Sequence, residues 1–307
     1  MSVLDRWQRF WFEPIPTHIY ALLRIVFGAI GCITLIGLSD VSTFWDPNGF
    51  VPVGSGLGVK TFFLAHGLGH AAGLALYVCT LASFVCMTIG FASTISVMLA
   101  MFLSVVQLAW NHLPLSGADS ALRAFLFCLM WADCGSAWSV DAWIRGSRIS
   151  APANQPTYAI APLRLIRFQI ALIYFNAGLW KLLNPYWRDG SAVHYVLETN
   201  VYHRFPALLP ATLDWVIPVL TYGTLFWELA FAFLVLFRPT RRLVIVLGIL
   251  LHVGMLLTIE IGPFHWVMLA SYLAFLDPRT VSTFGLPLKN QEPRPDFADA
   301  HMPAARS

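Results

Sequence analysis

Polar side chains that could carry out chemistry stand at the ends of long apolar runs. Lys181 closes one such run, and Asn111 and His112 directly follow another. Glu260 and His265 flank the short turn between two later runs. Amines, imidazoles and carboxylates can take up and release protons in a partly dry pocket. If the runs cross a membrane, these residues come from three separate segments to its external face, where they predict a pocket.

From its position alone, Lys181 has two interpretations. At a helix end, its stem could lie along lipid while the amine reaches the headgroups. The residues just below it, Asn176, Ala177 and Gly178, are small or polar and let a neighbouring helix approach closely. Tyr174 lies on the same face and is a candidate substrate contact. We therefore expect Lys181 to face the bundle, where desolvation disfavours the ammonium and lets the amine act as a base.

Three further ionisable residues lie inside apolar runs. His252 is about two turns before Glu260 and is expected to line the floor of the pocket. Arg24 and Glu228 lie deeper and toward the opposite face, where a mutual ion pair would explain both charges. We favour a structural pair for these two residues. No metal-ligand spacing such as HExxH occurs, so no metal is expected.

Composition indicates an all-α integral membrane protein that must position these residues. Hydrophobic residues make up 58% of the 307 residues and charged residues 11%, with a mean hydropathy of +0.67. Soluble domains have about 45–50% apolar and about 25% charged residues. The net charge is only +3. The basic residues lie mostly in loops and at helix ends, so no nucleic-acid partner is expected.

Apolar runs predict a polytopic bundle of about eight transmembrane helices. The runs cover residues 18–38, 72–90, 92–110, 120–137, 162–183, 213–237, 242–258 and 264–277. The second and third runs are read as a hairpin, because one helix of their joint length is too long for a single crossing. The domain boundaries that follow are an amphipathic cytoplasmic segment (1–17), a transmembrane domain (18–277) and a cytoplasmic, disordered tail (278–307).

Loop charges predict that both termini are cytoplasmic, in a multi-pass protein of the cell membrane. The side predicted to be cytoplasmic carries Arg6, Arg9, Arg145, Arg148, Arg238, Arg241, Arg242, Arg279, Lys289 and Arg294. The other side carries only Lys60, Arg123, Arg188 and Arg204. The long segments 40–70 and 184–210 are then external.

Five stretches resemble the transmembrane region of the vitamin K-dependent γ-carboxylases and their bacterial relatives, the HTTM (horizontally transferred transmembrane) family. They are LLRIVFG in the first run, WNH after the third, WSVDAW after the fourth, IYFNAGLWKL with YWRDG at the fifth, and IGPFHWVMLA at the eighth. Their order and spacing are similar over roughly residues 18–277. Each stretch alone is weak, but five in order are fairly specific.

The resemblance implies base-initiated oxygenation of a reduced quinone. In the carboxylases, the lysine of an AG-x-x-K stretch is held to be the base, and an Asn-His pair looks like part of its pocket. The matching positions here are Lys181, Asn111 and His112, which makes His112 a second expected catalytic residue. Trp180 stands where the carboxylases have another lysine. Their large extramembrane domain also has no counterpart in the short tail, so carboxylation of peptide glutamate by this chain alone is not expected.

Two functions stay open. The first is an enzyme that uses a membrane quinol, of the vitamin K type or another, as cofactor in an external pocket. The alternative is a non-enzymatic membrane component for export, maturation or immunity of a small secreted peptide, since some compact relatives are linked to maturation of exported peptide toxins. The expected partners are the lipid bilayer and either a small exported peptide or a separate extracytoplasmic protein. No internal repeat or pair of broken helices favours a transporter.

Overall fold

The computed structural model describes residues 2–46, 58–111, 116–146, 155–199, 202, 204–205 and 214–284. His112, parts of both long segments expected to be external and all of the tail from residue 285 lie outside the described residues. Pro278–Val281, at the start of the expected disordered tail, forms the short helix α15, which packs against α2 and β1.

The described chain is mostly helical. Its first half contains α1 (Val3–Phe12), β1 (Pro14–Pro16), α2 (His18–Gly37), α3 (Val41–Phe44), α4 (Val59–Ala65), α5 (Gly69–Ile89), α6 (Ser93–Trp110), α7 (Gly117–Leu129) and α8 (Val140–Ile144). Its second half contains β2 (Thr157–Ala159), α9 (Ala161–Leu183), α10 (Pro185–Arg188), α11 (Ala192–Glu198), α12 (Val216–Leu234), α13 (Arg238–Thr258), α14 (Phe264–Ser271) and the 3-10 helix η3 (Tyr272–Phe275). The two strands pair antiparallel, with Ile15 opposite Tyr158.

Five of the described helices are long and apolar enough to cross a membrane: α2, α5, α6, α12 and α13. The expected hairpin between α5 and α6 is confirmed, because Gly90 ends α5 at a φ of 75° and α6 begins at Ser93. The other three expected runs also contain helices. However, α7 has only 13 residues, α14 with η3 is a short apolar helix, and α9 contains Arg164, Arg167 and Lys181.

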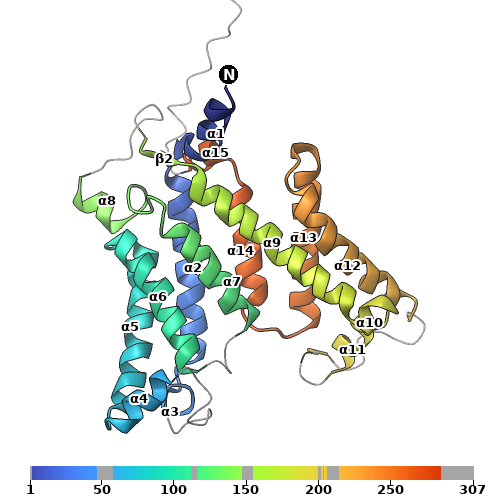
Figure 1. Ribbon diagram of the computed structural model, residues 1–307, viewed down its shortest axis with the longest axis horizontal. Helices are drawn as coiled ribbons and strands as arrows, with labels where there is room; N and C mark the ends of the chain where they lie inside the picture. Colours follow the sequence, from blue (N-terminus) through green and yellow to red (C-terminus); the bar gives the residue numbers. More distant parts are fainter. Residues whose placement is uncertain are drawn as a thin grey trace, which may run out of the picture.

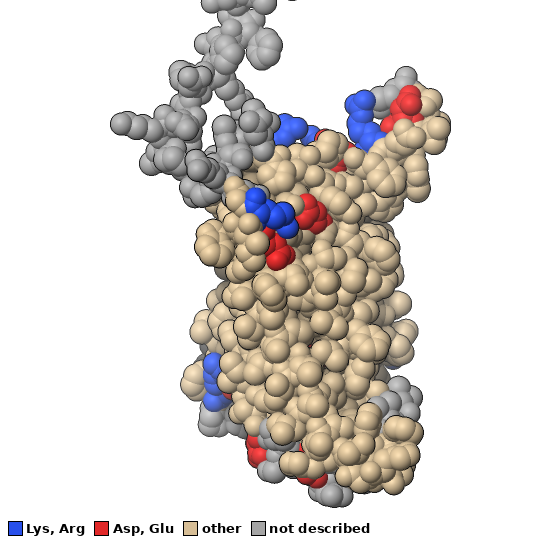
Figure 2. All heavy atoms as spheres, turned by 90° about the vertical axis from the view of Figure 1, so that its left-hand side faces the viewer, with Lys and Arg blue, Asp and Glu red and all other residues tan. Residues whose placement is uncertain are grey.

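The helices form two groups joined by α9 (Figure 1). α2, α5, α6 and α7 lie together on one side, and α12 and α13 lie on the other. α9 crosses obliquely between them and contacts both α7 and α12, while α14 contacts α2, α7 and α13. On the face shown in Figure 2, charged residues gather toward the two ends, with a band of uncharged residues between them. A band of this kind suits the hydrocarbon core of a bilayer.

Arg24 joins α2 to two other segments through its guanidinium group. The side chain is fully buried. Nε donates to the carbonyl of Cys134 at 3.1 Å, and Nη2 donates to that of Trp138 at 2.6 Å. Nη1 donates to the carbonyls of Met87 and Thr88, in the last turn of α5. Carbonyls at a helix C-terminus lack intrahelical donors and carry partial negative charge, so they suit a cation.

The expected ion pair between Arg24 and Glu228 is therefore wrong. Backbone carbonyls surround Arg24, whereas the carboxylate of Glu228 accepts hydrogen bonds from Lys181. A buried charge needs compensation, but a helix end can supply it as well as an acidic side chain.

The WSVDAW stretch closes the same end of the α5–α6 hairpin. Asp141 accepts hydrogen bonds from the backbone N–H groups of Ala92 and Ser93, at 2.8 and 2.7 Å, and so caps α6. Burial raises the pKa of Asp141, but the hydrogen bonds from Ser93 and Ala92 outweigh it and bring the pKa below its usual value. Ala92 and Trp138 both have a positive φ, 47° and 45°. Two strained residues are thus held beside these contacts.

Arg24→Leu should lower the yield of folded protein and its melting temperature, because four carbonyl groups lose their donor. An unsatisfied buried group costs about 1–3 kcal/mol. The decrease in melting temperature should be larger than that caused by Arg145→Leu, which removes a hydrogen bond to the carbonyl of Gly135. Thermal unfolding in detergent, followed by intrinsic fluorescence, measures both variants. Adding Glu228→Leu should not restore Arg24→Leu, and restoration would show that the two side chains meet.

Candidate functional site

The amine of Lys181, at the end of α9, contacts the carboxylate of Glu228 on α12. Nζ donates to both carboxylate oxygens at 2.7 Å. The Lys181 side chain is 25% exposed and that of Glu228 is 9% exposed. The ring of Trp187, just beyond α9, lies with its centroid 5.1 Å from Nζ. The amine therefore faces α12, while part of the Lys181 side chain stays exposed.

Gly178 explains how the two helices come close enough for this pair. A Cβ atom at this position would lie 2.9 Å from the side chain of Leu229 and 3.2 Å from its backbone nitrogen. The neighbour of Leu229 on α12 is Glu228. The small residue expected to admit a neighbouring helix thus sits at the α9–α12 crossing, less than one turn before Lys181.

A buried hydrogen-bonded cluster lies farther along the same face of α9. The hydroxyl of Tyr174 is 2.7 Å from Nε2 of His252 and 2.6 Å from the hydroxyl of Tyr272. All three residues are buried. A Cβ atom at Gly248 would lie 2.1 Å from the hydroxyl of Tyr272, so only a glycine on α13 lets that hydroxyl reach the cluster.

His265 extends this cluster toward the turn between α13 and α14. Its ring centroid is 6.0 Å from that of His252, and both residues are buried. Among the described residues, neither ring nitrogen of His265 has a hydrogen-bond partner, nor does Nδ1 of His252. Buried polar groups are costly when unpaired. These three nitrogens are therefore candidate contacts for a polar group of a ligand.

Glu260 and Asn111 were expected in the same pocket, but the structure gives both of them partners outside this cluster. The Glu260 carboxylate is exposed and lies 3.4 Å from Nη2 of Arg204. Asn111 donates from Nδ2 to the carbonyl of Phe44 at 2.9 Å. Figure 1 shows the C-terminal ends of α6, α9 and α13 at the same end of the molecule, but with the ends of α6 and α9 on opposite sides of it.

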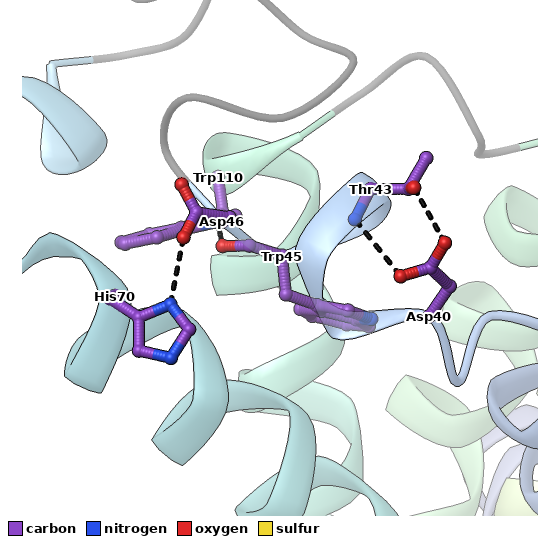
Figure 3. Close-up of polar contacts among 6 residues, drawn as sticks. All are labelled: Asp40, Thr43, Trp45, Asp46, His70 and Trp110. Carbon is purple, nitrogen blue, oxygen red and sulfur yellow. Dashed lines mark hydrogen bonds and ion pairs between the residues drawn. The ribbon is translucent and has the colours of Figure 1, made fainter.

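The tryptophan and asparagine of the WNH stretch hold the segment that follows α2. Nε1 of Trp110 donates to the carbonyl of Trp45 at 2.9 Å, and the neighbouring Asn111 binds the carbonyl before it. In Figure 3, Asp46 faces His70 on α5, with Oδ2 2.7 Å from Nδ1. Burial lowers the pKa of Lys60 on α4, although the nearby Asp46 opposes this shift.

Sequence reasoning missed several of these partners. The Asp46–His70 contact depends on the position of a connecting segment, which no motif indicates. Tyr272 lies inside an apolar run, where His265, seven residues earlier, is the polar neighbour at helical spacing that could have singled it out. Trp187 lies in the YWRDG stretch, six residues after Lys181. A tryptophan this close to a lysine in the sequence is the signal that could have indicated the cation–π contact.

An apolar groove between α12 and α13 lies on the outer side of the buried cluster. Its volume is about 450 Å³, and its lining includes Thr224, Trp227, Val244 and Leu247. Trp227 forms the boundary, because its ring contacts Tyr174 at a centroid distance of 4.8 Å and its Nε1 donates to the carbonyl of Val244. Thr224 lies one turn before Glu228 on α12, but neither Glu228 nor Lys181 is among the residues that line the groove.

Residues 12–279 match the model of the HTTM domain. This chain belongs to the HTTM family. With the five candidate spans, this membership identifies a multi-pass protein of the cell membrane. No solved structure matches.

Two relatives of this HTTM protein come from Bacillus subtilis (strain 168). It is 29% identical over 121 residues to sporulation-delaying protein SdpB, and this match covers 38% of each chain. The aligned part is therefore little more than a third of SdpB. It is 24% identical over 281 residues to the uncharacterized protein YitO, which covers 87% of this chain and 88% of YitO.

Lys181→Met and Glu228→Leu should each destabilise the protein, because each leaves the other charge without its partner. Breaking a buried pair costs about 3–5 kcal/mol, and partial exposure of the amine places the expected loss at the lower end. The double variant should recover most of this loss. Melting temperatures in detergent complete the double-mutant cycle. Arg204→Ala at the exposed Arg204–Glu260 pair is the matched control and should change little.

Proposed function

We propose that this HTTM protein is an enzyme of the external membrane face that uses Lys181 as a base toward a reduced membrane quinone. The observation that carries the proposal is the partly exposed amine held between Glu228 and Trp187. A lysine placed among lipid headgroups needs no acidic partner inside the bundle. Here the amine faces the bundle, one face of α9 carries both Lys181 and the buried polar cluster, and an apolar groove lies on the other side of Trp227.

Glu228 gives the pair two positions for one proton. With the proton on Lys181, the pair is an ammonium and a carboxylate. With the proton on Glu228, it is a neutral amine and a carboxylic acid, and low polarity favours this uncharged form more than water does. The neutral amine can accept a proton from an acidic hydroxyl of a ligand while Glu228 retains the proton it received. Glu228 thus takes the role of proton acceptor for the proposed base.

The residues around the pair fit an apolar ligand that carries a ring. The α12–α13 groove has about 450 Å³ of mostly apolar space, enough to take up a ring or part of a prenyl chain. Trp227 and Val244 would hold it, and Thr224 offers a hydroxyl in the groove, one turn before Glu228. A reduced quinone, when bound, would supply an acidic hydroxyl and reducing power toward oxygen. Asn111 and His112 are not assigned to this step.

Lys181→Arg tests the base. Arginine keeps the positive charge and can keep the contact with Glu228, but its pKa of roughly 12 or above prevents proton release. A positioned base contributes about 10²–10⁴-fold to rate. We therefore expect oxygen uptake by the protein in lipid nanodiscs, with a reduced naphthoquinone added, to fall at least a hundredfold in Lys181→Arg. The variant should insert and melt like the natural protein.

Arg204→Lys, an exposed change expected at the same membrane face, is the control and should keep full oxygen uptake. Absence of quinone-dependent uptake by the natural protein would contradict the enzymatic proposal. Uptake that survives Lys181→Arg at matched expression would remove Lys181 from the base role.

The second candidate function is a non-enzymatic one, in the export, maturation or immunity of a small secreted peptide. The segment similar to SdpB favours it, and an ion pair between α9 and α12 could serve only to stabilise the bundle. In that case charge is sufficient, so any peptide phenotype of the gene should persist in Lys181→Arg. The same variant therefore separates the two functions. The peptide or a separate extracytoplasmic protein would be the partner.

We also propose eight membrane crossings with both termini in the cytoplasm. Support comes from a helix in each expected run and from the basic residues Arg238, Arg241 and Arg242 where α13 begins, at the same end of the molecule as α1. Reporter fusions at the α12–α13 turn should report the cytoplasm, and fusions after Asp189 should report the external side. A turn found outside would overturn this orientation.

A further inference from the structure

Helix α1 presents an apolar face that the rest of the described chain leaves largely exposed, apart from the partly buried Trp11. At 100° per residue, one side of the helix carries Val3, Leu4, Trp7, Phe10 and Trp11. Val3 is 82% exposed, Leu4 63%, Trp7 59% and Phe10 47%. Large apolar side chains gathered in this way on a short helix mark an interaction surface.

The helix is already formed and fixed at both ends. At its start, the hydroxyl of Ser2 accepts from the N–H of Asp5 at 3.0 Å, and the carboxylate of Asp5 accepts from the N–H of Ser2 at 2.7 Å. This capping box stabilises the first turn. At its other end, the guanidinium of Arg164 on α9 lies 3.9 Å from the ring centroid of Phe10 and 4.0 Å from Glu13.

The position of α1 in the chain confines it to one membrane surface. α1 ends at Phe12, and the candidate span α2 begins at His18. The five residues between them reach at most about 18 Å, and the pairing of β1 with β2 restricts them further. The apolar face is therefore always within reach of the lipid around α2.

The charge on the polar side of α1 indicates the kind of lipid. Arg9 lies roughly opposite Trp7, and Arg6 lies at the edge of the apolar face, next to Phe10. Arg164 is also at this end, as are the basic residues at the start of α13 (Figure 1). A leaflet with anionic headgroups complements these charges, and each basic residue near such a surface strengthens attachment.

We propose that α1 inserts Val3, Leu4, Trp7 and Phe10 into the headgroup region of an anionic leaflet, while Arg6 and Arg9 contact lipid phosphates. This surface is separate from the Lys181 site and does not depend on the function proposed for it. The attachment fixes the N-terminal end of α9 through Arg164, on the same helix that carries Lys181 at its other end.

Hydrogen–deuterium exchange of residues 3–12 in the full-length protein tests the attachment. The protein is placed in nanodiscs of phosphatidylcholine alone or with about one third phosphatidylglycerol. Two arginines near an anionic surface should slow exchange about tenfold to thirtyfold in the anionic discs relative to the neutral ones. Trp7→Glu should abolish protection in both lipids.

Two further variants separate the contributions of charge and apolar contact. Arg6→Gln with Arg9→Gln should remove the difference between the two lipids and keep the slower exchange that neutral lipid alone gives. Gln8→Ala, on the polar side of α1, is the matched control and should behave like the natural protein. Equal exchange in both lipids, unchanged by Trp7→Glu, would overturn the proposal. Protection that depends on the number of protein copies per disc instead of the lipid would assign the surface to a second copy and also overturn it.

Discussion

The positive charge of Arg24 must be compensated inside the bundle, and the first half of the protein is arranged around that requirement. Four carbonyl oxygens converge on the guanidinium, from the last turn of α5 and from the segment after α7. A hydrocarbon environment offers no water to unpaired carbonyls. The carbonyl oxygens therefore compensate the charge of Arg24, and the guanidinium supplies the donors that the last carbonyls of α5 lack. These hydrogen bonds help to hold the α5–α6 hairpin beside α2, together with the close packing of Gly28 and Gly31 against α5.

The second half depends on a different constraint, which is close approach between helices. Gly178 lets α12 pack closely against α9, and Gly248 lets the hydroxyl of Tyr272 lie against the surface of α13. Without the first approach, the amine of Lys181 and the carboxylate of Glu228 would lie too far apart for a bidentate contact. Without the second, the hydroxyls of Tyr174 and Tyr272 would not meet. Two positions without a side chain thus determine where the polar groups of the candidate site lie.

Sequence reasoning located the helices and the orientation of Lys181 because both depend on local pattern. Every expected run contains a helix, although the run 120–137 continues beyond the end of α7 at Leu129. Small residues beside the lysine indicate the side on which a helix packs. It could not choose partners for buried charges. Arg24 and Glu228 each require a partner of opposite charge or polarity. A pattern of residue types shows neither which backbone carbonyls lie near Arg24 nor how close α9 comes to α12. Asn111 illustrates the same limit, since a polar residue at a helix end can bind a backbone carbonyl as readily as a substrate.

The contacts made by Trp110, Asn111 and His70 fasten the chain at residues 44–46, and the buried Lys60 fastens it again at α4. α4 contacts both α5 and α6. The start of α5 and the end of α6 thus hold the chain on both sides of residues 47–57, and this end of the hairpin is closed by two segments that lie outside the candidate spans.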